Sequence, residues 1–514
     1  MSAALPDIVV GSGPSGVAVA TALLARGRHV LMIDGGKRLE PERAAARTVM
    51  SRQSPDTWDA GALGAWQSPQ HKAPPGAIRR YGSDFALAPA DQTFAEGAEQ
   101  FHLRASLAVG GLSNLWGSAL LPYASSDMDG WPISPEGLAP HYAAVADFLP
   151  VAGRNDDLAP LFPALKMEGR APLPPSPQAR ILLERFADAR AALAQNGMVA
   201  GQSRLAVSPG CALCGQCLHG CPWGLIWSAQ KHLTRLIEQS GFSYRPGQMV
   251  CHLSDQGAGA SLQLADGGQV HGRRIFLATG TLETARILMA SGLAPQGLTL
   301  RDSAHGFLPA LHRWSAGQRP DRGPFHTLPQ AFVELMAPDL SPHLIHAQIY
   351  SWNDYYARDL IARFGKRLPF IAPLWQALAR RLIVAQIFLH SDHSASAHLT
   401  LAPDGRLKAS LIENPDSAPL FALAARRVGA GLRAGGLQPL SFAARLDPAG
   451  SGFHAGASLP MQVRSAPGGS DLLGRPHGLQ HVHVCDASVL PAIPATTITL
   501  PVMANAHRIG SLAP

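Results

Sequence analysis

The chain has 514 residues, of which 46% are hydrophobic and 15% are charged. This composition offers material for more than one core and excludes a disordered or collagen-like chain. The formal charge is +7, yet no Lys/Arg tract is interleaved with aromatic residues, so nucleic acid is not an expected partner.

The amino terminus and the cysteine content indicate where the chain works. The opening "MSAALPDIVV" lacks a basic segment followed by a long apolar one, and no run of about 18 apolar residues follows, so no export signal or membrane span is expected. Six cysteines in a chain of this length do not form a disulfide framework. We therefore expect a cytoplasmic protein.

The stretch "DIVVGSGPSGVAVATALLARGRHVLMIDGG" predicts a dinucleotide site built from strand, turn, helix and strand. Gly11, Gly13 and Gly16 have the G-x-G-x-x-G spacing that permits a tight turn, lets a pyrophosphate approach and allows close helix packing. Asp34 ends the second strand, where its carboxylate can accept hydrogen bonds from ribose. An ordinary glycine-rich turn is the alternative, and the motif alone does not distinguish FAD from NAD. The expected elements are a strand at 8–10, a helix at 17–25 and a strand at 30–33.

Four cysteines fall within eleven positions of "SPGCALCGQCLHGCPWG", residues 208–224. Cys211, Cys214, Cys217 and Cys221 fit C-x2-C-x2-C-x3-C-P, the ferredoxin spacing for a [4Fe–4S] cluster. The fourth ligand is either Cys221, which we favour, or Cys251. The alternatives are a zinc site, which brings two pairs together across a longer loop, a disulfide pair, or a loop without metal.

The stretch 355–392 combines arginines and lysines with large apolar residues. Leu374, Leu378 and Leu382 are spaced to share one helix face. One interpretation is an amphipathic helix on an anionic membrane, which would place the protein at the inner membrane face and admit a quinone or a lipid-linked substrate. The interpretation we favour is a helix that packs over a substrate sheet with its basic residues solvated. The basic residues are Arg358, Arg363, Lys366, Arg367, Arg380 and Arg381.

Four further stretches resemble sequences of the glucose-methanol-choline (GMC) oxidoreductase family of FAD enzymes. They are "RASLAVGGLSNLWG" (104–117), "DGWPISPEGLAPHY" (129–142), "IFLATGTLETARILMASG" (275–292) and "HVHVCDASVLPAIPATTITLPVMANAHRIG" (481–510). In that family the first lies against the flavin, the third returns to the FAD site, and an aspartate of the fourth reaches the cofactor. The resemblance therefore implies FAD. Beyond the first glycine turn and Asp34, it implies cofactor-binding roles for Gly110, Gly111, Ser113, Asn114, Gly280 and Asp486.

The same resemblance implies a catalytic histidine. "SGFHAGASLPM" is similar to the family's H-x-x-G-T-x-x-M segment, with His454 as the histidine, Ala457 for the glycine and Ser458 for the threonine. Such a histidine takes the hydroxyl proton of an alcohol while its carbon gives up a hydride, which suits a neutral imidazole. The family's second His or Asn is replaced by Thr497, whose hydroxyl can contact a substrate but cannot act as a base.

The resemblance also implies the architecture, an α/β fold (α+β overall) with two interleaved domains. A Rossmann-like FAD-binding domain would comprise residues 1–140, 201–305 and 451–514, including the cysteine loop. A substrate domain with an antiparallel sheet and helices would comprise 141–200 and 306–450.

The expected function is an FAD-dependent alcohol dehydrogenase that oxidises a polar, sugar-like substrate. The cluster would export electrons singly to an external acceptor such as a cytochrome, a ferredoxin or a quinone, since a flavin takes two electrons and a cluster passes one. The sugar assignment rests on family analogy. The alternatives are a redox adaptor without its own alcohol substrate, and a reductase that uses the same site in reverse.

Overall fold

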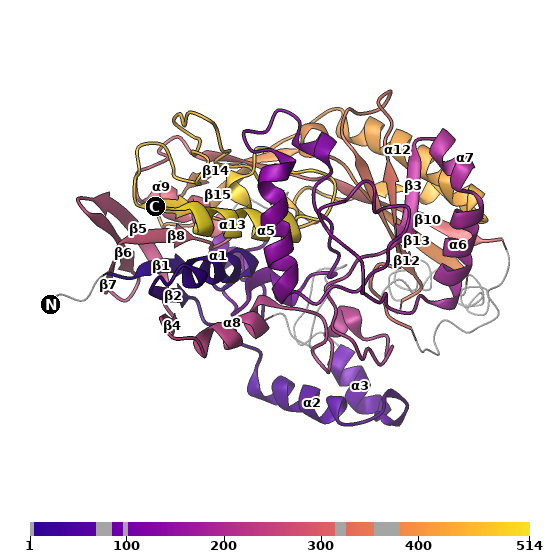
Figure 1. Cartoon of the computed structure of the whole chain (residues 1–514), viewed down its shortest axis with the longest axis horizontal. Helices are drawn as coiled ribbons and strands as arrows, with labels where there is room; N and C mark the ends of the chain where they lie inside the picture. The colour runs from indigo at the N-terminus through magenta and orange to yellow at the C-terminus, as the bar shows by residue number, and fades with distance from the viewer. Residues whose placement is uncertain (1–4, 68–84, 96–100, 314–324, 354–380) are drawn as a thin grey trace.

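The computed structural model describes residues 5–67, 85–95, 101–313, 325–353 and 381–514. Two groups of elements lie side by side in Figure 1, one around a parallel sheet and the other around an antiparallel sheet. The predicted fold class is confirmed, since a Rossmann-like sheet is combined with a second, antiparallel sheet.

The parallel sheet has the strand order β19-β8-β1-β2-β4. All of its neighbouring strands run parallel, so their carboxyl ends share one edge. The chain turns in opposite directions from β1, to β2 on one side and to β8 on the other, and ligands of open sheets bind at such a point. The strands are β1 (Asp7–Val10), β2 (Val30–Asp34), β4 (Phe242–Pro246), β8 (Arg274–Leu277) and β19 (Val482–Val484).

Helices pack against this sheet and form one hydrophobic core with it. The first helix contacts both the last helix and α8, and the last helix also contacts α5. The helices are α1 (Pro14–Ala25), α5 (Pro135–Phe148), α8 (Ala229–Ile237), α9 (Thr281–Ala290) and α13 (Thr499–Leu512). A three-stranded sheet packs beside β8 and consists of β5 (Val250–Gln256), β6 (Gly259–Leu264) and β7 (Gln269–Gly272).

The antiparallel sheet has the order β16-β10-β13-β12-β11-β3, and β17 also pairs with β10. Alternate residues on one face, such as Val333, Ala347 and Ala385, are fully buried with three helices in a second core. The strands are β3 (Met198–Gln202), β10 (His305–His312), β11 (Ala331–Leu335), β12 (Ile345–Ser351), β13 (Leu382–Phe388), β16 (Leu437–Pro439) and β17 (Arg445–Leu446). The helices are α6 (Pro177–Asp188), α7 (Arg190–Gln195) and α12 (Ser417–Ala434).

The hydrophobic cores divide the chain differently from the expected domains at two places. Tyr142 of α5, which lies beyond the expected boundary at 140, packs into the first core, as do Ala397 and Leu399 of β14. β14 belongs to a sheet with the order β15-β14-β9-β18, whose strands are β9 (Leu298–Asp302), β14 (Ser396–Leu401), β15 (Leu407–Ile412) and β18 (Ala455–Gly456). The remaining helices are α2 (Pro41–Ser51), α3 (Ala60–Gln67) and α4 (Ala90–Thr93).

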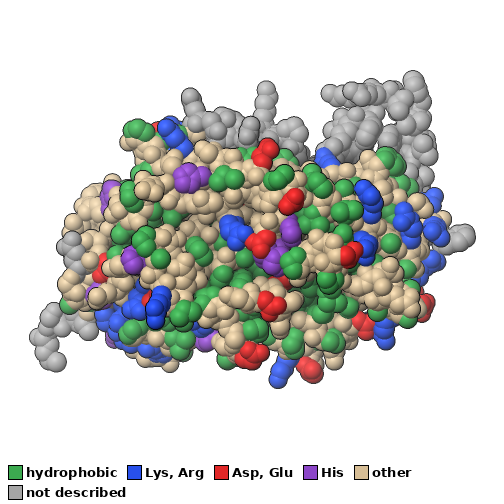
Figure 2. Space-filling view, turned by 90° about the horizontal axis from the view of Figure 1, so that it is seen from above, with side chains coloured by type: hydrophobic (Ala, Val, Ile, Leu, Met, Phe, Trp, Pro, Cys, Tyr) green, Lys and Arg blue, Asp and Glu red, His purple; other side chains and the backbone are tan. Residues whose placement is uncertain are grey.

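Most of the basic and apolar stretch at 355–392 lies outside the described residues. Leu382, which was expected on its helix face, instead begins β13, because the β-branched run that follows it fills the centre of a sheet. Within the described ranges, no helix has both the length and the apolarity to cross a bilayer. On the face in Figure 2, basic side chains lie in separate groups with acidic ones among them.

Candidate functional site

The glycine turn lies where β1 is flanked by β8 and β2. Gly11 has φ +98°, and a Cβ there would lie 2.5 Å from the carbonyl oxygen of Ala278. A Cβ on Gly16 would lie 1.9 Å from the carbonyl oxygen of Gly11, whereas one on Gly13 would meet nothing within 4 Å. Packing therefore requires two of the glycines, while Gly13 borders open space at the amino end of α1, where backbone N–H groups attract phosphate.

Asp34 connects this turn to two other segments. Its Oδ1 accepts a 2.8 Å hydrogen bond from the hydroxyl of Tyr244, and its Oδ2 accepts one from Ser12. The hydroxyl oxygen of Ser12 accepts a 3.0 Å bond from the backbone N–H of Gly110. A carboxylate offers about four lone-pair positions, so Asp34 keeps capacity for a ribose hydroxyl.

The loop at 110–114 contacts the glycine turn directly. Gly110 and Gly111 both have positive φ, and a Cβ on Gly111 would lie 3.3 Å from the Cα of Gly13. The side chains of Ser113 and Asn114 donate to the carbonyl oxygens of Gly110 and Gly111 at 2.5 and 2.8 Å. Both side chains thus hold the loop in shape beside the turn.

Asp486 and Gly280 follow the neighbouring strands β19 and β8 at the carboxyl edge of the sheet. The Thr284 hydroxyl donates to Oδ2 of Asp486 at 2.5 Å, and the backbone N–H of Ser488 donates to Oδ1 at 3.0 Å. Burial raises the pKa of Asp486. The expected cofactor residues of the first and last segments therefore lie along one sheet edge.

The segment that contains His454 runs beside Asp486. The backbone N–H groups of Ala457, Leu459 and Met461 donate to successive carbonyl oxygens of the 3-10 turn Ala487–Val489 at 2.8–2.9 Å. This ladder is regular, so the substitution of alanine for the family's glycine at position 457 is accommodated, with φ +53°.

His454 is a half-buried residue that packs against the antiparallel sheet. Its ring stacks on Phe388 with centroids 4.9 Å apart and an interplanar angle of 20°. Burial, and then the charges of His305 and His346, lower the pKa of His454 to about 3. The imidazole is therefore neutral near pH 7, and its Nδ1 is buried without a hydrogen-bond partner among the described residues.

Thr497 is buried, and its hydroxyl is occupied by the backbone. Its Oγ1 accepts a 2.8 Å bond from the N–H of Leu121 and lies 3.5 Å from that residue's carbonyl oxygen. The hydroxyl therefore joins the last segment to Leu121, which follows the loop at 110–114 along the chain. It is the neighbouring Thr496 whose Oγ1 is buried without a partner in the described part of the chain.

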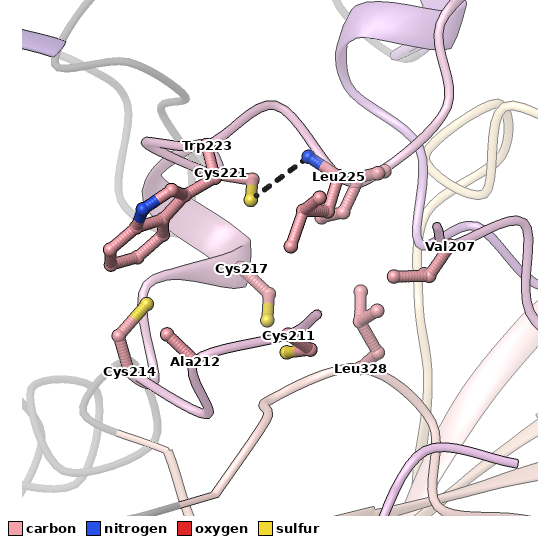
Figure 3. A pocket seen from close by; sticks show the side chains of 10 residues that line it. Val207, Cys211, Ala212, Cys214, Cys217, Cys221, Trp223, Leu225 and Leu328 are labelled. Atoms are coloured by element: carbon pink, nitrogen blue, oxygen red, sulfur yellow. Dashed lines mark hydrogen bonds between the residues drawn. The ribbon is translucent and has the colours of Figure 1, made fainter. Parts of the chain in front are cut away.

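Cys211, Cys214, Cys217 and Cys221 line one small cavity. Figure 3 shows their sulfur atoms around a common space, and the dashed line marks the 3.3 Å bond from the N–H of Leu225 to the sulfur of Cys221. The other lining side chains are apolar: Val207, Ala212, Trp223, Leu225, Ile226 and Leu328.

The environment of Cys211, Cys214 and Cys217 disfavours free thiolates. Burial, together with neighbouring cysteines, raises the pKa of Cys214 to about 12, that of Cys217 to about 11, and that of Cys211 as well. A cation bound between the sulfurs would supply the charge that thiolates need here. Cys251 is not among the lining residues, since it lies on β5 of the three-stranded sheet, so the structure groups Cys221 with the other three.

Sequence reasoning did not single out Glu334 and His346, which the structure brings close to His454. Glu334 of β11 lies opposite His346 of β12, which lies opposite Phe388 of β13. "IHAQIYS" carries a signal, because polar residues alternate with apolar ones at the period of a strand, whereas in "AFVEL" a single glutamate interrupts an apolar run. Their cross-strand register depends on contacts between distant segments.

Comparison with known proteins points to one family for the last segment. Residues 438–506 match the GMC oxidoreductase family model. This GMC segment contains His454, Asp486 and Thr497. The whole chain has the fold of a solved structure described as pyridoxine 4-oxidase from Mesorbium loti, with a TM-score of 0.62, 16% sequence identity and 98% of each chain covered. No curated protein sequence matches the chain.

Proposed function

We propose that this chain is an FAD-dependent oxidoreductase that oxidises a CH–OH group of a polar, sugar-like substrate. We further propose that it is a dehydrogenase that exports electrons one at a time through a [4Fe–4S] cluster to an external acceptor. The GMC segment supports oxidoreductase chemistry. The observation that carries the specific proposal is that four cysteines with ferredoxin spacing line one cavity in a chain that also has a nucleotide-type glycine turn.

The residues present fit FAD. The open space at Gly13, the loop at Gly111 that lies against it and the carboxylate of Asp34 belong to segments that contact one another. Asp486 and Gly280 lie at the same sheet edge as the turn. When bound, FAD would accept a hydride from the substrate carbon, and a cluster would pass electrons singly.

The cysteines fit a metal cluster better than a disulfide. The four thiols share one apolar cavity, and burial raises the pKa values of Cys214 and Cys217, so a bound cation would favour the thiolate form of these two. Three of them are separated by two residues each, which lets neighbouring sulfurs reach adjacent corners of a cubane.

His454 would act on the reacting hydroxyl. A neutral imidazole accepts the hydrogen bond of a substrate O–H and can take its proton as the C–H bond breaks. Stacking on Phe388 fixes the ring plane, and the backbone carbonyl oxygen of His454 accepts a 2.9 Å hydrogen bond from the N–H of Ser303.

The test is anaerobic mixing of the FAD-loaded protein with a panel of sugars and other alcohols, followed at the visible flavin band. We expect at least one sugar-like alcohol to bleach the band, and the reduced protein to pass electrons to a one-electron dye. If no alcohol bleaches the flavin while dithionite does, the protein is not an alcohol oxidoreductase. Rapid stoichiometric hydrogen peroxide formation in air would show an oxidase and overturn the proposed electron export.

A further inference from the structure

A row of ring and carboxyl side chains crosses four strands of the antiparallel sheet. The strand register places Glu334 opposite His346, His346 opposite Phe388, and Phe388 opposite His305. The residues one position away along these strands, such as Val333, belong to the second core. Because side chains alternate between the faces of a strand, the row lies on the other face of the sheet.

The Glu334–His346 pair is the polar part of this row. Nδ1 of His346 lies 2.8 Å from Oε1 of Glu334, and both side chains are fully buried. A carboxylate only accepts hydrogen bonds, so an ionised Glu334 requires the Nδ1–H tautomer of His346, whose Nε2 carries the lone pair. Neither Nε2 of His346 nor Oε2 of Glu334 has a hydrogen-bond partner among the described residues.

This pair lies beside the candidate catalytic histidine. His346 and His454 both contact the ring of Phe388, at centroid distances of 6.0 and 4.9 Å. The two imidazoles are close enough for the charge of His346 to act on His454. Two imidazole nitrogens that lack a hydrogen-bond partner in the described part of the chain, Nε2 of His346 and Nδ1 of His454, are thus buried around one phenyl ring.

The same sheet face continues toward the loop that lies against the glycine turn. Phe307, Gln386 and Tyr350 lie further along the same strands, on the same face as the row, and each is only partly buried. A Cβ on Gly117, at the end of that loop, would lie 3.6 Å from the hydroxyl of Tyr350. The row therefore lies at the buried end of a partly exposed face that reaches the candidate flavin site.

We propose that the Glu334–His346 pair is a second catalytic base of this site. In this proposal His346, and not His454, takes the proton: Nε2 of His346 would accept the hydroxyl proton of the substrate while the hydride of the same carbon leaves to oxidised FAD and the carbonyl forms. His454 would then donate a hydrogen bond to the same oxygen from its neutral imidazole. The inference rests on the proposed function. His346 would act as the second base that Thr497 cannot provide, since a hydroxyl is not a base and that of Thr497 is bound to Leu121.

Two physical arguments favour this role. A buried nitrogen lone pair without a partner carries a desolvation cost, which a substrate hydroxyl that donates to Nε2 would remove. The carboxylate of Glu334 fixes the ring and stabilises the imidazolium that forms, as a carboxylate does for the base of a catalytic triad. The neighbours of His454, by contrast, disfavour its charged form.

The experiment compares His346→Gln and Glu334→Gln with the control His312→Gln. His312 is a buried histidine of the same sheet whose Nε2 also lacks a partner among the described residues, but it lies on the opposite face. With the alcohol that bleaches the wild-type flavin, H346Q should slow bleaching by about 100-fold or more, and E334Q by about 10-fold or more. H312Q should stay within about twofold of the wild-type rate, since proton transfer does not involve it.

Two further measurements separate a catalytic role from a structural one. In H346A, added imidazole should restore part of the bleaching rate, because it can occupy the space of the lost base. In the FAD-free protein labelled with 15N-histidine, the His346 signal, assigned by its loss in H346Q, should be that of the Nδ1–H tautomer, and E334Q should change it.

Bleaching of H346Q at the wild-type rate, or an Nε2–H tautomer in the wild type, would overturn the role of the pair and leave the proposed function standing. A wild-type protein that no alcohol bleaches would overturn the proposed function itself. The tautomer is measured without FAD or substrate, so the two failures are distinguishable.

Discussion

Replacing Gly13 and Gly16 separately by alanine should change two different properties: Gly13→Ala should weaken cofactor binding, and Gly16→Ala should lower the stability of the fold. A Cβ on Gly16 would lie 1.9 Å from the carbonyl oxygen of Gly11, which is inside any van der Waals contact, whereas one on Gly13 would meet no atom within 4 Å. The two glycines are three residues apart in the same turn, so each variant is the matched control of the other.

The expected magnitudes follow from these contacts. Alanine is favoured over glycine within a helix by about 1 kcal/mol. In Gly16→Ala the displacement of the backbone costs more than this gain, so the free energy of unfolding should show a net fall of roughly 1–3 kcal/mol. Gly13 has φ −66° at the N-cap of α1, where alanine is tolerated at a cost below about 1 kcal/mol. The methyl group of Gly13→Ala would instead occupy the space that the pyrophosphate approaches, so FAD affinity should fall by about 10- to 100-fold, or roughly 1.4–2.8 kcal/mol.

The assay has two parts on the same preparations. Urea unfolding of the FAD-free proteins gives the free energy of unfolding. Titration with FAD, monitored by the quenching of flavin fluorescence, gives the dissociation constant of FAD. Gly13→Ala should fold like the wild type and bind FAD weakly, while Gly16→Ala should be clearly less stable. If Gly13→Ala binds FAD with wild-type affinity, the pyrophosphate does not lie at this turn.

Three further variants test the neighbouring assignments. His454→Ala should slow flavin bleaching by alcohol about 100-fold or more with FAD content unchanged, and near-normal bleaching would remove His454 from the chemistry. Thr497→Val leaves the N–H of Leu121 without its partner, so chemical unfolding should show a loss of about 1–3 kcal/mol, with a smaller effect on bleaching than His454→Ala. Burial raises the pKa of Asp302 to about 6, so the folded protein holds this proton more tightly than the unfolded chain and stability falls as pH rises from about 4 to about 6. Asp302→Asn keeps an acceptor for the N–H of Gly450. Its free energy of unfolding should exceed that of the wild type by up to about 3 kcal/mol at pH 8 but not at pH 4. Unfolding curves that equal those of the wild type at both pH values would contradict this.

Local patterns of the sequence predict the half of the chain around the parallel sheet well. The turn at Gly11, the strand that ends at Asp34 and the strand before Gly280 are each read from residues that are neighbours along the chain. The cysteine loop is also local, and the structure brings Cys221, not Cys251, to the cavity of the other three.

The sequence could not predict contacts that depend on the register of distant strands. β14 was expected in the substrate domain, but it pairs with β9 about a hundred residues earlier, because Ala397 and Leu399 fill the first core. Leu382 was expected on a helix and begins a central strand. Glu334 and His346 become neighbours only when β11 pairs with β12 in one register, and a shift of either strand by one residue would place the two side chains on opposite faces of the sheet.

The most direct test of the account is the iron and acid-labile sulfide content of the anaerobically purified protein, measured for the wild type, Cys217→Ser and Cys251→Ser. We expect about four irons and four sulfides per chain in the wild type and in Cys251→Ser, and a loss of both in Cys217→Ser. Zinc without sulfide, or no metal at all in the wild type, would contradict electron export through this loop.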